Sequence, residues 1–182
     1  ITVRIAAEGE GVICIDTPAL LAKVQTLKPD VPVEFHGDGK SVTITQGRTR
    51  WTAPCLLDDF PQMPAVSGEP VSLGADFIAG LKACIPAIEI GSRYYLNGVF
   101  TDGSRLVATD GKRLNVIQHA AEISSKAILP MKAAAKIVTV FPKGCMATVS
   151  ETAALFAMDG TVLWTRLVDG TFPDYRRVVP RN

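Results

Sequence analysis

The segment 37–41 reads GDGKS and is the stretch of the chain that comes nearest to a phosphate-binding loop. A P-loop carries a glycine five positions before the glycine of its GK pair, and Glu34 occupies that position here. A P-loop also leads into a helix whose N-terminus binds phosphate, whereas residues 42–44 form a β-branched run typical of a strand. The spacing therefore predicts a hairpin turn at 37–41 and no nucleotide site.

The sequence offers few residues for metal binding or nucleophilic catalysis. The two histidines, His36 and His119, have no HExxH or comparable ligand spacing, and no Ser, Cys and His form a recognisable nucleophile motif. No two cysteines are close enough for a CxxC pair, so we expect free thiols in a reducing cytosol; they are Cys14, Cys55, Cys84 and Cys145. Several aspartates precede glycine, as hairpin turns prefer; they include Asp102, Asp110, Asp159 and Asp169. We therefore predict no catalytic residues, no metal and no cofactor.

Basic residues are the remaining candidates for binding. Lys132 and Lys136 are spaced i,i+4, which places them on one face of a predicted helix, and Lys82 lies on an earlier predicted helix. This basic face is either solvated or binds DNA phosphates without reading the base sequence. Arg176 and Arg177 lie in a proline-flanked extended segment. That segment is either a solvated surface or one wall of a peptide-binding groove.

The composition bounds the class of protein. The chain has 182 residues, of which 47% are hydrophobic and 20% charged, and these values favour a packed core. Residues 1–66 contain 6 basic and 8 acidic residues, whereas residues 67–182 contain 13 and 10, which permits a nucleic-acid partner for the second part. A tight sequence-reading DNA-binding protein would be more basic. No apolar run approaches the ~18 residues of a membrane span, so we expect a cytoplasmic protein with no membrane partner.

An internal repeat organises the chain. A Phe-Pro pair at 60–61 recurs at 172–173, and Pro18 and Pro130 each precede one of these pairs by 42 residues. The two copies are therefore offset by 112 residues. In each copy the proline lies in the first turn of a predicted helix of about ten residues, where its missing N–H has no cost. Three short strands follow each helix.

The predicted elements repeat as strand, helix and three strands. The strands expected in the first and last copies are 31–36, 42–46, 49–54, 147–150, 153–158 and 162–168. The elements expected between these copies are a strand at 71–73, a helix at 75–84, and strands at 94–100, 106–109 and 113–119. The Asp-Gly pairs at Asp102 and Asp110 are expected to be turns in this middle copy. The prediction is an α+β fold in which the helices lie on one face of antiparallel sheets.

The same repeat gives the domain boundaries. Because two units make one domain, we expect residues 67–182 to form a complete domain and residues 1–66 the second half of another, with a linker at 64–70. Residues 1–7 alternate in polarity and are expected to be the last strand of a further unit. An isolated half-domain exposes a sheet edge, which favours aggregation. We therefore expect the missing half to exist in the full gene, or a partner chain to cover the edge.

Four stretches carry a resemblance to a known family. They are RYYLNG at 93–98, ATDGKRL at 108–114, LVDGTFPDYRRVVP at 167–180 and VTITQGRTRWTAPCLLDDFPQMP at 42–64. In order and spacing, the first three resemble the second domain of the bacterial DNA polymerase III beta subunit, the processivity sliding clamp. The fourth resembles the second half of that family's first domain. The resemblance implies a DNA clamp fold and a non-catalytic subunit of the polymerase holoenzyme.

The resemblance also implies a ring around duplex DNA, lined by helices that meet the DNA without sequence specificity. The positions that it assigns to the DNA-facing surface are Lys82, Arg93, Tyr94, Tyr95, Lys132 and Lys136. The two tyrosines and the preceding loop at 89–93 match positions at the edge of the hole. Aromatic rings at such positions can stack on an exposed base.

A partner-binding groove is the second site that the resemblance implies. In the family this groove lies on the second domain, is completed by the third, and takes short apolar peptides from the polymerase catalytic subunit, the clamp loader and other proteins. The matching positions are Leu96, Thr109, Gly111, Lys112, Arg113, Leu114, Pro173, Arg177 and Val178. The apolar members can form a pocket, and Arg177 can bind polar or carboxylate groups of a peptide.

Ring closure in the family joins the first domain of one subunit to the third domain of the other in a homodimer. The matching first-domain positions are Lys23, Leu27, Arg48, Arg50 and Thr52. No part of the sequence matches the third domain. We therefore expect either a fragment of a full-length clamp or a truncated homologue that binds partner peptides without encircling DNA. An enzyme that uses Lys40 with a nucleotide is a third hypothesis.

Overall fold

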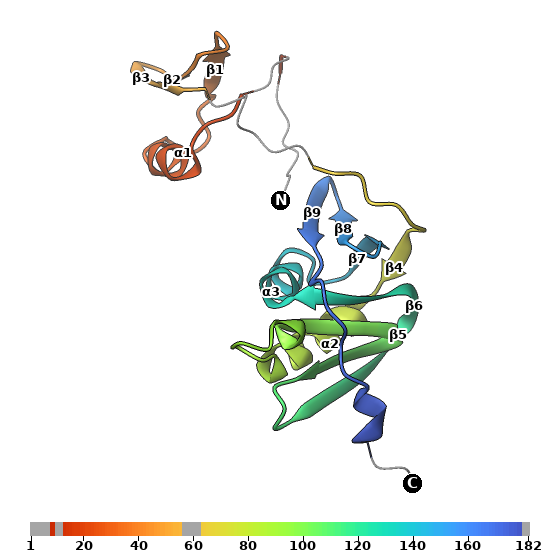
Figure 1. The fold of residues 1–182 in the computed structure, drawn as a ribbon. Helices are drawn as coiled ribbons and strands as arrows, with labels where there is room; N and C mark the ends of the chain where they lie inside the picture. The colour runs from red at the N-terminus through yellow and green to blue at the C-terminus, as the bar shows by residue number, and fades with distance from the viewer. Residues whose placement is uncertain (1–7, 10–12, 56–62, 180–182) are drawn as a thin grey trace. The chain divides into compact units, whose positions relative to one another are not determined.

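The computed structural model of the chain describes residues 8–9, 13–55 and 63–179, which belong to two compact units (Figure 1). The smaller unit lies within Ala6–Met63 and the larger within Pro64–Asn182. The strand expected at 1–7 lies outside the described residues. No helix in the described ranges is both long and apolar enough to cross a membrane.

The smaller unit is one helix beside a three-stranded antiparallel sheet in the order β1-β2-β3. Its elements are α1 (Thr17–Val24), β1 (Glu34–Gly37), β2 (Ser41–Gln46) and β3 (Thr49–Pro54). Pro18 lies in the first turn of α1, as predicted, and the Asp16 carboxylate caps the helix by accepting a hydrogen bond from the Ala19 N–H at 3.1 Å. The predicted helix and the second and third strands are therefore confirmed.

The first strand of this unit begins three residues later than predicted. The Gln46 side-chain amide accepts a hydrogen bond from the Lys28 N–H at 2.8 Å and donates to the carbonyls of Lys28 and Val31 at 2.9 and 3.0 Å. These backbone groups are satisfied by a side chain and need no strand partner. The ladder therefore starts at Glu34, after the segment that Gln46 holds.

The GDGKS segment forms the hairpin turn that its spacing predicts. The Asp38 carboxylate accepts hydrogen bonds from the backbone N–H groups of Lys40 and Ser41 at 2.9 and 2.6 Å, and Gly39 has a φ of +83°. These hydrogen bonds, with that from the Ser41 N–H the strongest, lower the pKa of Asp38. A carboxylate of this chain thus occupies backbone donors that a P-loop would offer to phosphate.

The larger unit has two antiparallel sheets, a four-stranded sheet in the order β4-β7-β8-β9 and the hairpin β5-β6. Its helices and strands are β4 (Val71–Leu73), α2 (Ala75–Cys84), β5 (Gly98–Thr109), β6 (Leu114–Pro130), α3 (Met131–Val140), β7 (Cys145–Val149), β8 (Ala153–Met158) and β9 (Thr161–Arg166). The predicted bounds of β4, α2 and β8 are confirmed. Asp159 and Gly160 have φ values of +48° and +75° and form the predicted turn between β8 and β9.

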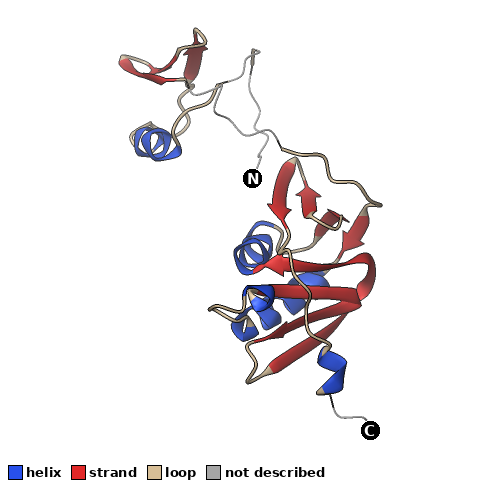
Figure 2. Ribbon diagram, viewed as in Figure 1, coloured by secondary structure: helices blue, strands red, loops and turns tan. Residues whose placement is uncertain are grey.

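The main core is formed by residues of α2, α3 and both sheets, whose backbones are drawn in Figure 2. Phe77 and Leu81 of α2 and Ile137 of α3 are buried in it, and the two helices contact one another. Cys84 and Cys145 are buried free thiols in the same core, and burial raises the pKa of each to about 11. The apolar faces of α2 and α3 are thereby fixed, which leaves their polar faces exposed.

The middle of the chain corrects the prediction of three strands. Residues 94–96 form a 3₁₀ helix, and a single strand, β5, runs from Gly98 to Thr109. Asp102-Gly103 is therefore not a turn: the β5–β6 register shifts on both sides of Gly103, which has a φ of +66° and marks a β-bulge. The turn predicted at Asp110-Gly111 is confirmed between β5 and β6.

Strand β6 continues for eleven residues beyond the predicted end at His119 and reaches Pro130. The polar run of Glu122, Ser124, Ser125 and Lys126 hid this extension in the sequence. Ile123 within this run and Ala127 just after it are buried, and Ser125 between them is half-buried. The strand period is therefore present, but its inward positions hold small or isolated apolar residues.

Candidate functional site

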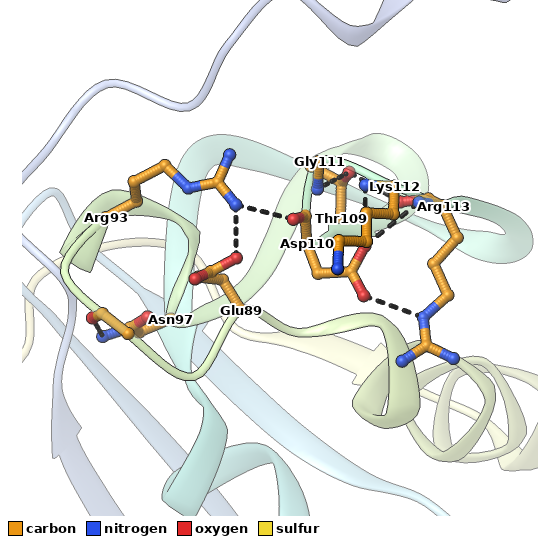
Figure 3. Close-up of polar contacts among 9 residues, drawn as sticks. Glu89, Arg93, Asn97, Thr109, Asp110, Gly111, Lys112 and Arg113 are labelled. Carbon is orange, nitrogen blue, oxygen red and sulfur yellow. Dashed lines mark hydrogen bonds and ion pairs between the residues drawn. The ribbon is translucent and has the colours of Figure 1, made fainter.

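The turn between β5 and β6 is organised by Asp110 (Figure 3). Its carboxylate accepts hydrogen bonds from the backbone N–H groups of Lys112 and Arg113 at 2.9 and 3.0 Å and from Arg113 Nε at 3.0 Å. The backbone donors, Lys112 first, hold the pKa of Asp110 at about 2, so the carboxylate is ionised at neutral pH. Thr109 Oγ1 donates to the Arg113 carbonyl at 2.6 Å and accepts from the Gly111 N–H at 3.0 Å.

Arg93 joins the preceding loop to this turn. Its Nη2 donates to Glu89 Oε2 at 2.5 Å and to the Asp110 carbonyl at 2.6 Å (Figure 3). Gly111 has a φ of +83°, and a Cβ built there would lie 2.6 Å from Arg93 Nη1. Glycine therefore suits the positive φ, and a Cβ there would displace the guanidinium from its close approach to the turn. This predicted DNA-binding side chain is engaged within the chain, and its contact with DNA stays a prediction.

The 3₁₀ helix Tyr94–Leu96 turns its three side chains to different environments. Leu96 is buried, Tyr95 is half-buried and Tyr94 is 60% exposed, with the two tyrosine rings edge-to-face at 5.6 Å. A Cβ at Gly170 would lie 3.0 Å from Tyr95 Cβ, so glycine allows the segment after β9 to pack against this helix. Tyr94 therefore has the exposed ring that stacking on a base requires.

A second apolar cluster contains predicted groove residues from the 3₁₀ helix and from the start of β6, packed against the C-terminal segment. Leu96 and Leu114 pack in it with the C-terminal segment, whose ring Phe172 stacks on Phe100 with centroids 4.8 Å apart and planes 4° from parallel. The other members are Val107, Ile128 and Tyr175, with Tyr95 and Val168 at the margin. The predicted groove residues of the C-terminal segment lie on its exposed side; they are Pro173, Arg177 and Val178.

Asp102, predicted to be a turn residue, is instead a buried residue of β5 whose carboxylate meets the C-terminal segment. It is 8% exposed and accepts hydrogen bonds from Tyr175 Oη at 2.9 Å and from Arg176 Nη2, and Lys126 Nζ lies 3.4 Å away. It lines a cleft of about 440 Å³ beside the segment 168–176. Of the predicted groove residues, Pro173 is the one that lines this cleft. No local signal marks Asp102, because its partners Tyr175 and Arg176 lie 73 and 74 positions away.

The predicted DNA-facing lysines are exposed on neighbouring helices. Lys82 lies in the last turn of α2, and Lys132 and Lys136 lie on α3, which contacts α2. The buried residues of α3 lie on the side away from Lys132 and Lys136, and Lys82 is exposed at the end of α2, so all three side chains are accessible to a solution partner. Their contact with DNA stays a prediction.

The predicted interface residues belong to the smaller unit. Lys23 and Leu27 are half-buried at the end of α1 and just beyond it. Arg48 follows the β2–β3 turn glycine, and Arg50 and Thr52 are exposed on β3, an edge strand of the described sheet. An edge strand with exposed side chains has backbone groups that can pair with another chain.

Comparison with known proteins connects these elements to one family. A family model of the DNA polymerase III beta subunit, central domain, matches residues 82–174. The beta sliding clamp of Vibrio cholerae is 30% identical over 196 residues, covering 98% of this chain and 54% of that protein. The chain spans about half the length of the curated relatives it matches.

Solved structures give the same likeness. The DNA polymerase III subunit beta of Bartonella birtlesii, bound to griselimycin, is 29% identical with a TM-score of 0.85, over 95% of this chain and 52% of that chain. The beta clamp of Helicobacter pylori, bound to a DNA ligase peptide, has a TM-score of 0.85 at 24% identity, over 97% of this chain and 54% of that chain, and this second likeness shows the fold. The chain therefore belongs to the DNA polymerase III beta subunit family, the beta sliding clamps.

Proposed function

We propose that the chain is part of a processivity sliding clamp of a bacterial replicative polymerase, which encircles duplex DNA without sequence specificity and tethers the polymerase, the clamp loader and other partners through a peptide groove. The observation that carries this proposal is the match of the central-domain model to 82–174, which spans all the predicted groove positions except Arg177 and Val178. Residues 67–182 are proposed to be the second clamp domain and residues 1–66 the second half of the first. The division of the chain between 63 and 64 into compact units supports this boundary.

The groove is proposed to lie over the second apolar cluster. Leu96 and Leu114 contribute to the cluster, while Val178, 72% exposed, and Pro173 offer apolar surface beside it. Arg177 is exposed and has no ion-pair partner among the described residues, so its guanidinium can bind a peptide carbonyl or carboxylate. The ligands of the two related clamp structures, a DNA ligase peptide and griselimycin, support a site for such a ligand.

Peptide binding is tested by fluorescence polarisation with a labelled DNA ligase clamp-binding peptide. We expect saturable binding, and Arg177→Ala should raise the Kd at least about tenfold, as loss of one charge-assisted hydrogen bond does. Arg166→Ala, which removes an exposed arginine at the end of β9, is the matched control and should leave the Kd unchanged. The measurement is made on the protein that carries this chain, and absence of binding by the unaltered protein, or equal effects of the two substitutions, would contradict the proposal.

Encircling of DNA is tested on the protein that carries this chain. After loading, it should remain on circular duplex DNA and dissociate when the circle is cut, because a clamp is held by topology. Equal retention on both forms would favour the alternative of a protein-interaction module that does not encircle DNA.

The homodimer is proposed to involve the β3 edge. Arg48→Glu combined with Arg50→Glu should weaken self-association of that protein in sedimentation experiments, whereas Lys40→Glu in the opposite turn should not. Unchanged association in the double variant would place the interface elsewhere.

A further inference from the structure

The carboxylate of Asp102 is buried on the face of β5 that meets the C-terminal segment. Thr101 and Asp102 are consecutive residues of β5, yet both are buried, at 4% and 8% exposed. Successive side chains of a strand point to opposite faces, and both faces of β5 are covered: Thr101 lies beside Phe77 at the main core, while Asp102 lines the cleft beside the C-terminal segment. Thr101 is satisfied by the Ala127 backbone, since its Oγ1 accepts from the Ala127 N–H and donates to the Ala127 carbonyl, both at 3.2 Å. The Asp102 carboxylate is therefore available to accept hydrogen bonds from the C-terminal segment.

Two polar partners of Asp102 belong to that segment, and the third lies beside it on β6. Tyr175 Oη and Arg176 Nη2 donate to its Oδ2, and Lys126 of β6 lies beside Oδ1. Burial acts to raise the pKa of Asp102, but the Tyr175 hydrogen bond and the charges of Arg176 and Lys126 outweigh it, so the pKa is lowered. The carboxylate is therefore ionised at neutral pH and holds both donors with charge-assisted hydrogen bonds.

The two neighbouring arginines consequently differ in their surroundings. Arg176 is drawn onto Asp102 and its guanidinium lies 5.4 Å from the Tyr175 ring centroid, whereas Arg177 has no ion pair among the described residues. Both belong to a 3₁₀ helix, Tyr175–Arg177, too short to be stable alone. Something outside the helix must fix its orientation, and Asp102 contacts two of its three side chains.

We propose that Asp102 is a positioning residue of the peptide groove: it anchors the 3₁₀ helix through Tyr175 and Arg176, so that Arg177 alone of the arginine pair is presented to the peptide. This inference rests on the proposed function of the groove. It gives Arg176 a structural role, beside the ligand-binding role that the family resemblance already implies for Arg177.

Hydrogen–deuterium exchange tests the anchor without any ligand. Asp102→Asn keeps the size of the side chain but removes its charge, and it should speed exchange of the Arg177 and Val178 amides, which donate to the Asp174 and Tyr175 carbonyls. Exchange in α2 and α3 should be unchanged. Unaltered protection at 177–178 would overturn the proposal, as would faster exchange throughout the larger unit, because that result means general destabilisation.

Peptide binding tests the consequence for the groove, with the same labelled DNA ligase peptide. Asp102→Asn and Arg176→Ala should each raise the Kd about three- to tenfold, and the double variant should be no worse than either, because one anchor is lost in all three. Arg177→Ala added to Asp102→Asn should weaken binding further. Independent, multiplicative effects of Asp102→Asn and Arg176→Ala would overturn the anchor.

Tyr175→Phe provides a variant that keeps the ring in the apolar cluster and removes only the hydroxyl that reaches Asp102. It should reproduce part of the change in exchange and in Kd, and a Kd equal to that of the unaltered chain would count against the anchor. If the unaltered protein that carries this chain binds no peptide, the proposed groove fails, while the exchange experiment still decides whether Asp102 holds the helix.

Discussion

Replacing Gly111 with alanine tests the contact between Arg93 and the β5–β6 turn. The substitution has two separable costs. A non-glycine residue at a φ of +83° costs about 1–2 kcal/mol. The new Cβ would also lie 2.6 Å from Arg93 Nη1 and displace the guanidinium from Glu89 and Asp110. Because these groups are partly exposed, loss of the ion pair and hydrogen bond adds about 1–2 kcal/mol at most.

Gly39 offers a matched control for the backbone cost. It has the same φ of +83°, but a Cβ built there meets nothing within 4 Å. Gly39→Ala should therefore show only the conformational cost of about 1–2 kcal/mol. The control acts on the smaller unit, so each unit must be followed by its own probe. Trp51 belongs to the smaller unit and Trp164 to the larger, and replacing one with phenylalanine lets the other report.

The contribution of Arg93 is isolated by a double-mutant cycle. In a Trp51→Phe background, urea unfolding is followed by the fluorescence of Trp164 with and without Arg93→Ala. Gly111→Ala should lower the free energy of unfolding by about 2–4 kcal/mol when Arg93 is present and by about 1–2 kcal/mol when Arg93 is replaced by alanine. Equal costs in both backgrounds would refute the reasoning, because they would mean that the guanidinium does not depend on glycine at 111.

Three further predictions concern other parts of the larger unit. Burial lowers the pKa of His119 in the folded state below its usual 6.5. The stability that depends on neutral His119 is therefore complete above pH 6.5. It is lost as the pH falls, because the unfolded chain binds a proton at a higher pH than the folded chain does. His119→Phe should flatten this loss in unfolding measured between pH 7.5 and 5, and an unchanged slope would contradict the reasoning. Replacing both Lys132 and Lys136 with alanine should make the slope of the log association constant for duplex DNA against log salt concentration less negative by about 2. Lys143→Ala should leave this slope unchanged. Phe172→Ala should remove about 3–5 kcal/mol of local packing and release the C-terminal segment, seen as loss of exchange protection and of peptide binding; retained protection would show that the Phe100 stack is not needed.

Local signals predicted much of the fold. Asp-Gly pairs at Asp110 and Asp159 marked true turns because glycine supplies the positive φ that the turn requires. Helix α2 and the short strands β4 and β8 were predicted with their observed bounds because their apolar periods are regular. The offset repeat gave an antiparallel α+β fold, and the motifs identified the family.

Features that depend on a distant strand partner could not be predicted from local sequence signals. The Asp-Gly pair at Asp102 looks like the other turns, but the chain continues through it as a bulge because β6 pairs with β5 on both sides. Strand β6 was cut short because its outward positions are polar over many residues. A pairing partner decides both outcomes, and that partner is distant in sequence.

The surroundings of two arginines could not be predicted from the sequence. Residue type alone makes Arg93 and Arg176 available to a partner, and the family resemblance assigns Arg93 to the DNA-facing surface and Arg177, but not Arg176, to the groove. The structure separates them by their acceptors: Arg93 meets Glu89 and the Asp110 carbonyl, and Arg176 meets a buried carboxylate 74 positions away. A guanidinium already held by in-chain acceptors has less to offer a ligand than one that is exposed and unpaired. The residue type therefore predicts that a positive charge is present, but the distant acceptor decides whether that charge orders the chain or binds the partner.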